Sequence, residues 1–269
     1  MPRAPRTSTP PAAPLPPRQG AILAIVTDQG FATVEALAER FGVSPQTIRR
    51  EIIQLDRAGL LQRFHGGAGL PGPTVRLGYA RKQTLAAPAK DRIGAAAAAL
   101  VPDGASVFLD VGTTVEAVAR ALRDKRGLRV FTSSLPAAML LAGHDSTEVY
   151  VTGGVVRGAD GSLVGDSVTQ AIAQLHVDVA MIGFSGVGED GSLMDFDIQK
   201  VAVKQAIMAN ARSAVAVGDG LKFAHAAVVR IGPPAAFARL VTDTPPPAPL
   251  AERFRAAGLA VTVASGGAG

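Results

Sequence analysis

Two adjacent arginines, Arg49 and Arg50, lie in a polar segment that begins at Ser44 and also contains Gln46 and Thr47. Arginine can bind a guanine edge through two hydrogen bonds, and glutamine can bind adenine in the same way, so this set can read bases in a DNA major groove. The same side chains can instead bind phosphates, which positions a protein on DNA without reading its sequence. The segment is therefore a candidate for DNA binding, and the sequence does not assign either role to a particular arginine.

The residues around this segment predict that it begins a helix. Ile48, Ile52 and Leu55 recur at helical spacing, which forms one buried stripe and leaves the arginines exposed. Ser44 is a favoured N-cap, and the proline that follows it suits the first helical position. Two apolar helical stretches come earlier, and Gly42 is suited to end the second of them. Only Val43 separates this glycine from Ser44, and so short a turn between two helices predicts a helix-turn-helix.

The residues after this helix predict a hairpin wing. A short apolar strand at Leu60 and Leu61 leads to Arg63, His65 and a Gly-Gly turn, which would bring a basic residue toward the DNA backbone or minor groove. His65 also fits a turn residue that bonds locally. The whole segment could alternatively be a small helical domain that binds another protein. The Ser-Pro start, the arginine pair and the wing together favour DNA.

Charge is unevenly distributed along the 269 residues. Residues 1–90 contain 12 basic and 5 acidic residues, a net charge of +7, whereas residues 91–269 contain 15 and 17, a net charge of −2. Such asymmetry indicates that the first third meets a polyanion, although scattered surface arginines and lysines would give the same numbers.

The remaining two-thirds of the chain alternates short apolar strands with helical stretches, which predicts an α/β domain with a largely parallel sheet. We expect strands at 106–109, 129–132, 148–152, 178–182, 214–217, 240–242 and 260–263. The predicted organisation is a disordered Pro-rich tail at 1–17, a winged helix-turn-helix at 18–70, a linker at 71–90 and the α/β domain at 91–269.

Several predicted strands end in residues that could bind a phosphorylated ligand, because ligands of such sheets bind beyond the carboxyl ends of the strands. Asp110, Gly112, Thr113 and Thr114 lie between one strand and the helix it feeds, where glycine allows close approach and the helix N-terminus favours an anion. An ordinary loop with a threonine N-cap explains the same residues. The other candidates are Ser133, Ser134, Gly153, Gly154, Asp219 and Lys222. Each pair alone fits an ordinary turn, but together they predict a sugar-phosphate pocket.

Several classes of protein are excluded or disfavoured. No run of about 18 apolar residues could span a bilayer, and the basic N-terminal tail has no apolar region of a secretory signal. Cysteine is absent, and the four histidines lack ligand spacing, so we predict neither a metal site nor a cofactor. The cytoplasm is the default location.

The chain resembles the DeoR/GlpR family of bacterial transcriptional regulators over nearly its whole length after the tail. The N-terminal match is VSPQTIRREIIQLDRAGLLQRFHGGA, and the C-terminal matches are LDVGTT, VTGGVVR, VGD, GEDGSL and DGLKF in the family's order. The resemblance implies a regulator of sugar or polyol catabolic genes, generally a repressor. Its operator affinity would respond to a phosphorylated metabolite bound by a sensor domain similar to ribose-5-phosphate isomerase. It also implies a homodimer or homotetramer.

Two residues depart from the family pattern. Ser133 stands where asparagine is common, and Lys200 stands where glutamate is usual, whereas Lys204 is retained. An alternative is a sugar-phosphate isomerase with an accessory basic domain. The strand that would supply its acidic cluster is followed by neutral residues until Glu189 and Asp190 in the next turn. Asp110 remains a possible base, but a single carboxylate beside a phosphate loop more often orients a hydroxyl group. We therefore expect a regulator without catalytic residues.

Overall fold

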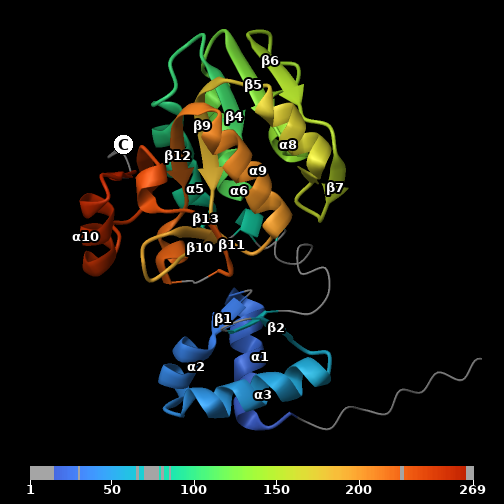
Figure 1. Cartoon of the computed structure of the whole chain (residues 1–269), viewed down its shortest axis with the longest axis vertical. Helices are drawn as coiled ribbons and strands as arrows, with labels where there is room; N and C mark the ends of the chain where they lie inside the picture. The colour runs from blue at the N-terminus through green and yellow to red at the C-terminus, as the bar shows by residue number, and fades with distance from the viewer. Residues whose placement is uncertain are drawn as a thin grey trace, which may run out of the picture. The chain divides into compact units, whose positions relative to one another are not determined.

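The computed structural model describes residues 15–29, 31–64, 67–69, 79, 82–84, 86–224 and 227–264. The chain divides into two compact units, residues 1–72 and residues 73–269 (Figure 1). Most of the predicted tail at 1–17 and of the predicted linker at 71–90 lies outside the described residues.

The first unit contains three helices and a small sheet. The helices are α1 (Pro17–Gln29), α2 (Val34–Phe41) and α3 (Pro45–Arg57), and the strands are β1 (Phe31–Thr33), β2 (Gln62–Phe64) and β3 (Gly67–Gly69) in the antiparallel order β1-β3-β2. The turn between α2 and α3 contains Gly42, whose φ of 61° is a conformation that favours glycine. The predicted helix-turn-helix and hairpin are confirmed.

The predicted strand at Leu60 and Leu61 is displaced. Both residues donate backbone hydrogen bonds to the carbonyl of Leu55, at 2.9 and 3.3 Å, so they belong to the turn that ends α3. Leu61 is buried in the core of this unit, and β2 begins one residue later. The periodicity of apolar residues could not distinguish a buried helix end from a short strand.

The core of the first unit combines residues from all three helices, among them Ile22, Leu37, Ile48 and Ile52. Polar contacts add to the packing between α1 and α3. The Nε atom of Arg18 donates to both carboxylate oxygens of Glu51, at 2.8 and 2.9 Å. The position of α3 is therefore set by apolar packing on one side and an ion pair beside it.

The second unit is built on a seven-stranded sheet with the order β15-β14-β12-β9-β4-β5-β6. Every neighbouring pair is parallel. The strands are β4 (Ser106–Leu109), β5 (Leu128–Thr132), β6 (Thr147–Val151), β9 (Val177–Gly183), β12 (Ala211–Val217), β14 (Arg239–Thr242) and β15 (Ala260–Val263). All seven predicted strands are confirmed, two of them with the predicted bounds and the others with ends that differ by at most three residues. The strand order reverses between β4 and β9.

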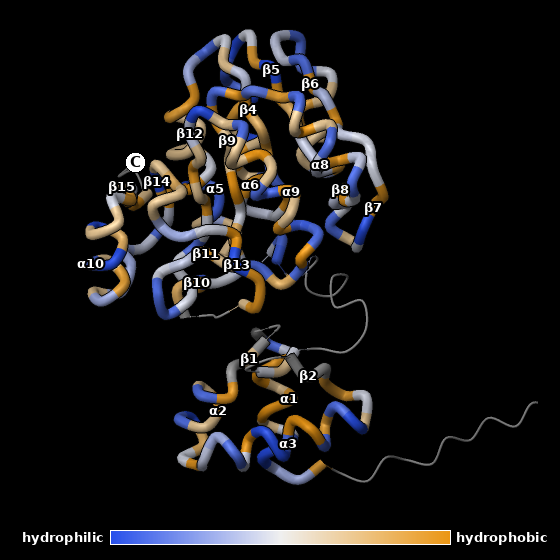
Figure 2. The backbone as a smooth tube through the Cα atoms, viewed as in Figure 1, coloured by the Kyte–Doolittle hydropathy of each residue, from blue (hydrophilic) through white to orange (hydrophobic). Residues whose placement is uncertain are grey.

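Helices cover both faces of this sheet (Figure 1). One face packs against α5 (Ala87–Ala98), α6 (Thr113–Leu122) and α7 (Leu135–Leu141), and the other against α8 (Asp166–Ala173), α9 (Ile198–Ala209) and α10 (Ala248–Ala256). Alternate residues of a strand enter the two cores: Val107 and Leu109 of β4 enter one, and Phe108 enters the other. Because helices cover both faces of the sheet, the central strand β4 is buried along its whole length and is mostly hydrophobic (Figure 2).

Smaller elements lie around the sheet. The hairpin of β7 (Val155–Arg157) and β8 (Ser162–Val164) follows β6, and β10 (Gly186–Val187), β11 (Leu193–Asp195) and β13 (Val229–Gly232) form a separate antiparallel sheet. Two 3-10 helices, η1 (Gly220–Ala224) and η2 (Pro234–Ala236), follow β12 and β13. These elements were not predicted. Helix α5 begins at Ala87, inside the segment that we expected to be a linker.

Candidate DNA-binding surface and effector site

The first turn of α3 presents the residues that were predicted to contact DNA. Ser44 caps the helix, because its Oγ atom accepts a hydrogen bond from the backbone N–H of Thr47 at 3.2 Å. Gln46, Arg49 and Arg50 are exposed, and Thr47 is half-buried. Figure 2 shows strongly hydrophilic residues along α3 among the hydrophobic ones that enter the core. The exposed helix tip that a major groove requires is therefore present.

The two arginines differ in their surroundings. The guanidinium of Arg49 lies 3.6 Å from the carboxylate of Glu35 on α2, and both side chains are mostly exposed. An exposed ion pair contributes little to stability, so Arg49 can leave Glu35 and bind DNA instead. Arg50 forms no ion pair within the part of the chain that the structure describes. Both arginines can therefore bind DNA, and Arg50 can do so without first losing an ion pair.

The wing is described only in part. Arg63 lies on β2, where its backbone pairs with Ala68, but its side chain lies outside the described residues. His65 lies outside them entirely. The roles predicted for these two residues remain predictions.

The point where the strand order reverses contains a buried ionic cluster. Lys204 of α9 donates to the carboxylate of Asp110, the first residue after β4, and to the carbonyl oxygen of Gly183 at 3.0 Å. Its ammonium also lies 3.4 Å from Asp195 of β11. The Asp110 carboxylate accepts a further hydrogen bond from the backbone N–H of Gly183, at 2.9 Å. Asp110 was predicted to bind the effector, but its carboxylate is occupied by protein partners, which favours a positioning role.

The pKa shifts in this cluster have opposing causes. Burial raises the pKa of Asp110 against the effect of Lys204. Burial alone would lower the pKa of Lys204, but the carboxylates of Asp110 and Asp195 outweigh it, so that pKa is raised. The charged form of Lys204 agrees with the geometry, because a neutral amine would leave two carboxylates facing each other in the interior. Lys204 is therefore charged, and it contacts both carboxylates of the cluster, Asp110 and Asp195.

The N-terminus of α6 is open to a ligand. Its N-cap is Gly112, with a φ of 121°, and no side chain caps the first turn. The alternative of a threonine N-cap is therefore wrong: Thr113 and Thr114 are the first two residues of the helix, and both are buried. The first backbone N–H groups of a helix lack partners within it and favour an anion. This geometry fits the predicted phosphate loop.

Helix α5 brings a further cation to this end of the sheet. Gly94 lets α5 approach α6 closely, because a Cβ atom there would lie 2.5 Å from the backbone oxygen of Ala117. One turn earlier, Lys90 is only 4% exposed, and burial lowers its pKa. The charges of Asp219 and Glu116 are near enough to raise that pKa in part. Lys90 therefore lies between α6 and the loop after β12.

The lysines of the chain converge here. The chain has 27 basic residues, but only six of them are lysines, and the five other than Lys125 lie at this end of the sheet. Lys200 of α9 is paired with Asp160. Desolvation lowers the pKa of Lys222, which Asp219 raises in part and the positive charge of Lys90 lowers further. Lys200 and Lys204 are already paired with carboxylates, so the positive charge that would attract an anion comes from Lys82, Lys90 and Lys222, which repel one another.

Two buried oxygen atoms at the ends of sheet strands lack hydrogen-bond partners within the described part of the chain. The side chains of Ser133 and Asp219 are 1% and 3% exposed, and the unpaired atoms are Ser133 Oγ and Asp219 Oδ1. Buried polar atoms are nearly always paired, by ordered water or a ligand where protein groups are lacking. Both atoms follow carboxyl ends of sheet strands, β5 and β12. Ser133 and Asp219 therefore fit the role of binding hydroxyl groups.

Other predicted residues have structural explanations. Ser134 is the N-cap of α7, where its Oγ atom accepts a hydrogen bond from Ala137 N at 3.2 Å. Gly153 and Gly154 are exposed, and a Cβ atom on Gly154 would lie 2.4 Å from Val168. The assignment of these three residues to effector binding remains a prediction, and the packing already accounts for two of them.

Sequence reasoning missed four residues of this site: Lys82, Lys90, Lys200 and Lys204. Lys82 and Lys90 were assigned to the linker, and Lys200 was noted only as a departure from a pattern. The scarcity of lysine among the basic residues was a signal that could have identified them.

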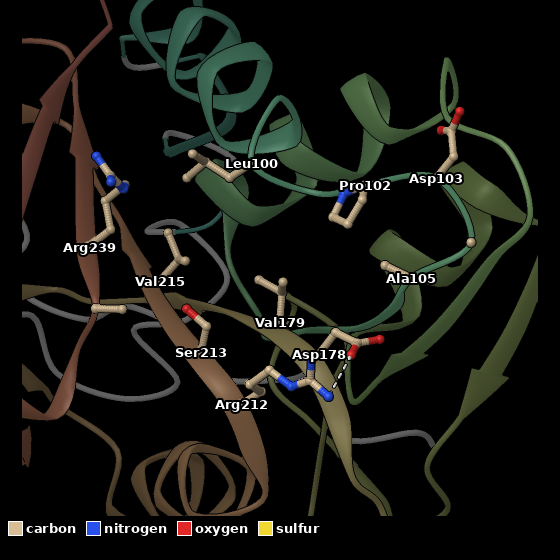
Figure 3. A pocket seen from close by; sticks show the side chains of 12 residues that line it. Leu100, Pro102, Asp103, Ala105, Asp178, Val179, Arg212, Ser213, Val215 and Arg239 are labelled. Carbon is tan, nitrogen blue, oxygen red and sulfur yellow. Dashed lines mark ion pairs between the residues drawn. The ribbon is translucent and has the colours of Figure 1, made fainter.

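A groove of about 600 Å³ lies at the opposite end of the sheet (Figure 3). Its lining includes Ala105, Asp178 and Arg239, which precede or begin strands, and an ion pair of 3.9 Å between Arg212 and Asp178. Ligands of open α/β sheets bind at the other end of the strands. We therefore do not assign the effector to this groove.

Neither a metal centre nor a membrane span is found in the described part of the chain. No three His, Asp or Glu side chains there form a group that could hold a metal ion. No helix among those residues is long and apolar enough to cross a bilayer.

Comparisons with known proteins agree with both units. Residues 18–74 match the DeoR-like helix-turn-helix domain, and residues 86–244 match the DeoR C-terminal sensor domain. The glycerol-3-phosphate regulon repressor of Escherichia coli strain K12 is 37% identical over 230 residues, which cover 86% of this chain and 91% of that protein. The repressor GlcR of Bacillus subtilis strain 168 is 31% identical over 203 residues, which cover 75% and 78%.

Solved structures show a more distant similarity. Ribose 5-phosphate isomerase A from Methanocaldococcus jannaschii superposes with a TM-score of 0.38 and 17% identity, over 51% of this chain and 55% of that one. The beta subunit of eIF2B from Chaetomium thermophilum gives a TM-score of 0.45 and 16% identity, over 79% and 59%.

A helix-turn-helix joined to an α/β sensor domain defines a DNA-binding transcriptional regulator. This chain belongs to the DeoR family. The two sequence relatives, the glycerol-3-phosphate regulon repressor and GlcR, are repressors and not enzymes, which agrees with the engaged state of Asp110 and contradicts the isomerase alternative.

Proposed function

We propose that this protein is a repressor whose affinity for operator DNA is modulated by a phosphorylated sugar or polyol bound to the sensor domain. The observation that carries the proposal is the uncapped N-terminus of α6 beside a cluster of lysines. Backbone N–H groups and ammonium groups are the usual partners of a phosphate. One relative is the glycerol-3-phosphate regulon repressor, so glycerol 3-phosphate is the first compound to test.

The roles within the site follow from charge and burial. The first turn of α6 and Lys222 bind the phosphate, and Ser133 Oγ and Asp219 Oδ1 bind hydroxyl groups of the effector. The Lys204–Asp110 pair positions the loop that leads into α6. On the DNA side, Gln46, Arg49 and Arg50 contact the major groove. The effector shifts operator affinity only if it binds the two conformations of the protein unequally.

We also propose that the protein acts as a homodimer or homotetramer. Helix-turn-helix proteins commonly bind two half-sites related by symmetry, which requires a second copy. Large apolar side chains on the sensor unit, Met139, Val155 and Ile198, are at least 69% exposed and are suited to burial against another copy. Sedimentation of the purified chain as a monomer at micromolar concentration would contradict this part.

A thermal-shift measurement tests the effector assignment. Glycerol 3-phosphate and other phosphorylated sugars and polyols are compared with their unphosphorylated counterparts, since a ligand of the folded state raises the Tm by mass action. We expect stabilisation only by phosphorylated compounds, and loss of that stabilisation in Lys222→Ala. A screen in which only unphosphorylated compounds raise the Tm would refute the proposal. Operator release is then measured with the stabilising compound and a DNA selected from a random library.

A further inference from the structure

The segment that leads from the first unit into α5 contacts the effector site. Tyr79 is described within this segment, and its hydroxyl donates to the Glu116 carboxylate on α6 at 2.9 Å. Burial raises the pKa of Glu116, against the effect of the Tyr79 hydrogen bond. Glu116 lies in the first turn of α6, the turn assigned to the phosphate. Tyr79 therefore attaches this segment to the helix that begins the site.

The backbone of the same segment is bound by a buried lysine. The Lys90 ammonium donates a hydrogen bond to the carbonyl oxygen of Lys82. Lys90 is 4% exposed, so this contact is largely shielded from solvent. Residues 82–84 form a short helical stretch immediately before α5. Hydrogen bonds thus connect Tyr79 to α6 and the backbone of Lys82 to α5.

The side chain of Lys82 adds a cation to the cluster. Its neighbours are Lys222, Lys200, Asp195 and Asp160. Asp160 is already paired with Lys200, and Asp195 lies against Lys204, so neither carboxylate is left for Lys82 alone. Desolvation, followed by the positive charge of Lys222, lowers the pKa of Lys82 to about 8. Among the described residues, Lys82 has no ion-pair partner, although its side chain remains accessible.

We propose that Tyr79 and residues 82–84 are part of the effector site, with the Lys82 ammonium binding the effector phosphate together with Lys222, so that the effector acts directly on the segment leading to the DNA-binding unit. This inference rests on the proposed function and extends it. Lys82 supplies a positive charge at the site, and a bound phosphate would supply the negatively charged partner that Lys82 lacks among the described residues. Tyr79 and residues 82–84 are covalently continuous with the helix-turn-helix unit, so a ligand that fixes them restricts the connection between the two units.

This arrangement provides a route for coupling. A ligand alters operator affinity only through contacts that differ between two states of the protein. A contact at Lys82 can differ in this way, because Lys82 is exposed and does not belong to either buried core of the second unit. Effector binding and operator binding would then favour different conformations of the segment that contains Tyr79 and Lys82.

The test compares lysine variants of the full-length protein by thermal shift in a titration of inorganic phosphate, which needs no knowledge of the natural effector. We expect Lys82→Ala to weaken phosphate binding about tenfold or more, as loss of a charged hydrogen bond does, and Lys82→Arg to retain most of it. The matched control is Lys125→Ala, which removes the one lysine away from the site. The Tm without phosphate is measured for each variant, which separates lost binding from lost stability.

The outcomes separate this inference from the proposed function. If phosphate stabilises the wild-type protein and Lys82→Ala equally but fails to stabilise Lys222→Ala, the inference is wrong and the proposed function stands. If neither phosphate nor any phosphorylated compound stabilises the wild-type protein, both fail. A selective loss in Lys82→Ala that Lys82→Arg restores supports the inference.

Discussion

The ammonium of Lys204 is in contact with the carboxylate of Asp110, and each side chain is only 1% exposed. The two residues are 94 positions apart in the sequence and meet where the strand order of the sheet reverses. Asp110 begins the loop that leads through Gly112 into α6, and Lys204 also binds the carbonyl oxygen of Gly183 at the end of β9. The pair therefore ties the candidate phosphate loop to the neighbouring strand.

Removal of Lys204 should destabilise the protein strongly. Lys204→Met leaves Asp110 and Asp195 buried without their cation, and breaking a buried pair in this way costs about 3–5 kcal/mol. The measurement is the free energy of unfolding in urea. Lys125→Met, a surface control, should change it by less than about 0.5 kcal/mol. Similar values for the two variants would show that Lys204 is dispensable to the fold.

Gly112→Ala should reduce both stability and phosphate binding. The φ of Gly112 is 121°, a region that residues with a Cβ atom rarely adopt, and forcing it costs about 1–3 kcal/mol. The control is Gly20→Ala in α1, where a Cβ atom meets nothing within 4 Å. Alanine is favoured in helices, so this control should stabilise by about 0.5–1 kcal/mol. Equal effects of the two substitutions on the Tm would show that the positive φ of Gly112 does not require glycine.

Arg50→Ala should weaken operator binding. Loss of an arginine that reads a base costs about 1–3 kcal/mol, whereas loss of a phosphate contact mainly lowers the dependence of affinity on salt. Gel-shift titrations at several salt concentrations distinguish the two roles. Arg57→Ala, in the last turn of α3, is the matched control and should bind normally. Unchanged affinity of Arg50→Ala would remove this residue from the DNA-binding surface.

Phosphate binding should weaken as the pH rises above about 8. The pKa of Lys82 is lowered to about 8 by desolvation and Lys222, with Lys200 acting in the same direction and Asp195 and Asp160 opposing it. Lys82 is therefore charged below that pH and loses its proton above it, while a phosphomonoester, whose second pKa is about 6, remains a dianion. Titration calorimetry from pH 7 to pH 9.5 should show this decline in the wild-type protein. In Lys82→Ala the decline should be smaller, and an identical profile would argue against Lys82 as the titrating group.

Much of the fold was predictable because local signals agree with each other. The Ser-Pro start, the stripe of Ile48, Ile52 and Leu55 and the turn at Gly42 all specify the same helix-turn-helix. The buried strands were recognisable because both faces of a parallel sheet require apolar residues. The strand at Leu60 and Leu61 was misplaced because two adjacent leucines satisfy a helix end and a strand equally well.

The sequence by itself determined the two domains, the exposed recognition helix and the strand ends at which a ligand could bind, since each depends on residues close together in the chain. Only the tertiary structure decided which charges meet. Lys204 neutralises Asp110, whereas Lys82, Lys90 and Lys222 gather from a connecting segment, a helix and a loop at one end of the sheet. Coulombic interactions depend on distance in space, and the order of strands in a sheet, which sets those distances, is not written in any local pattern.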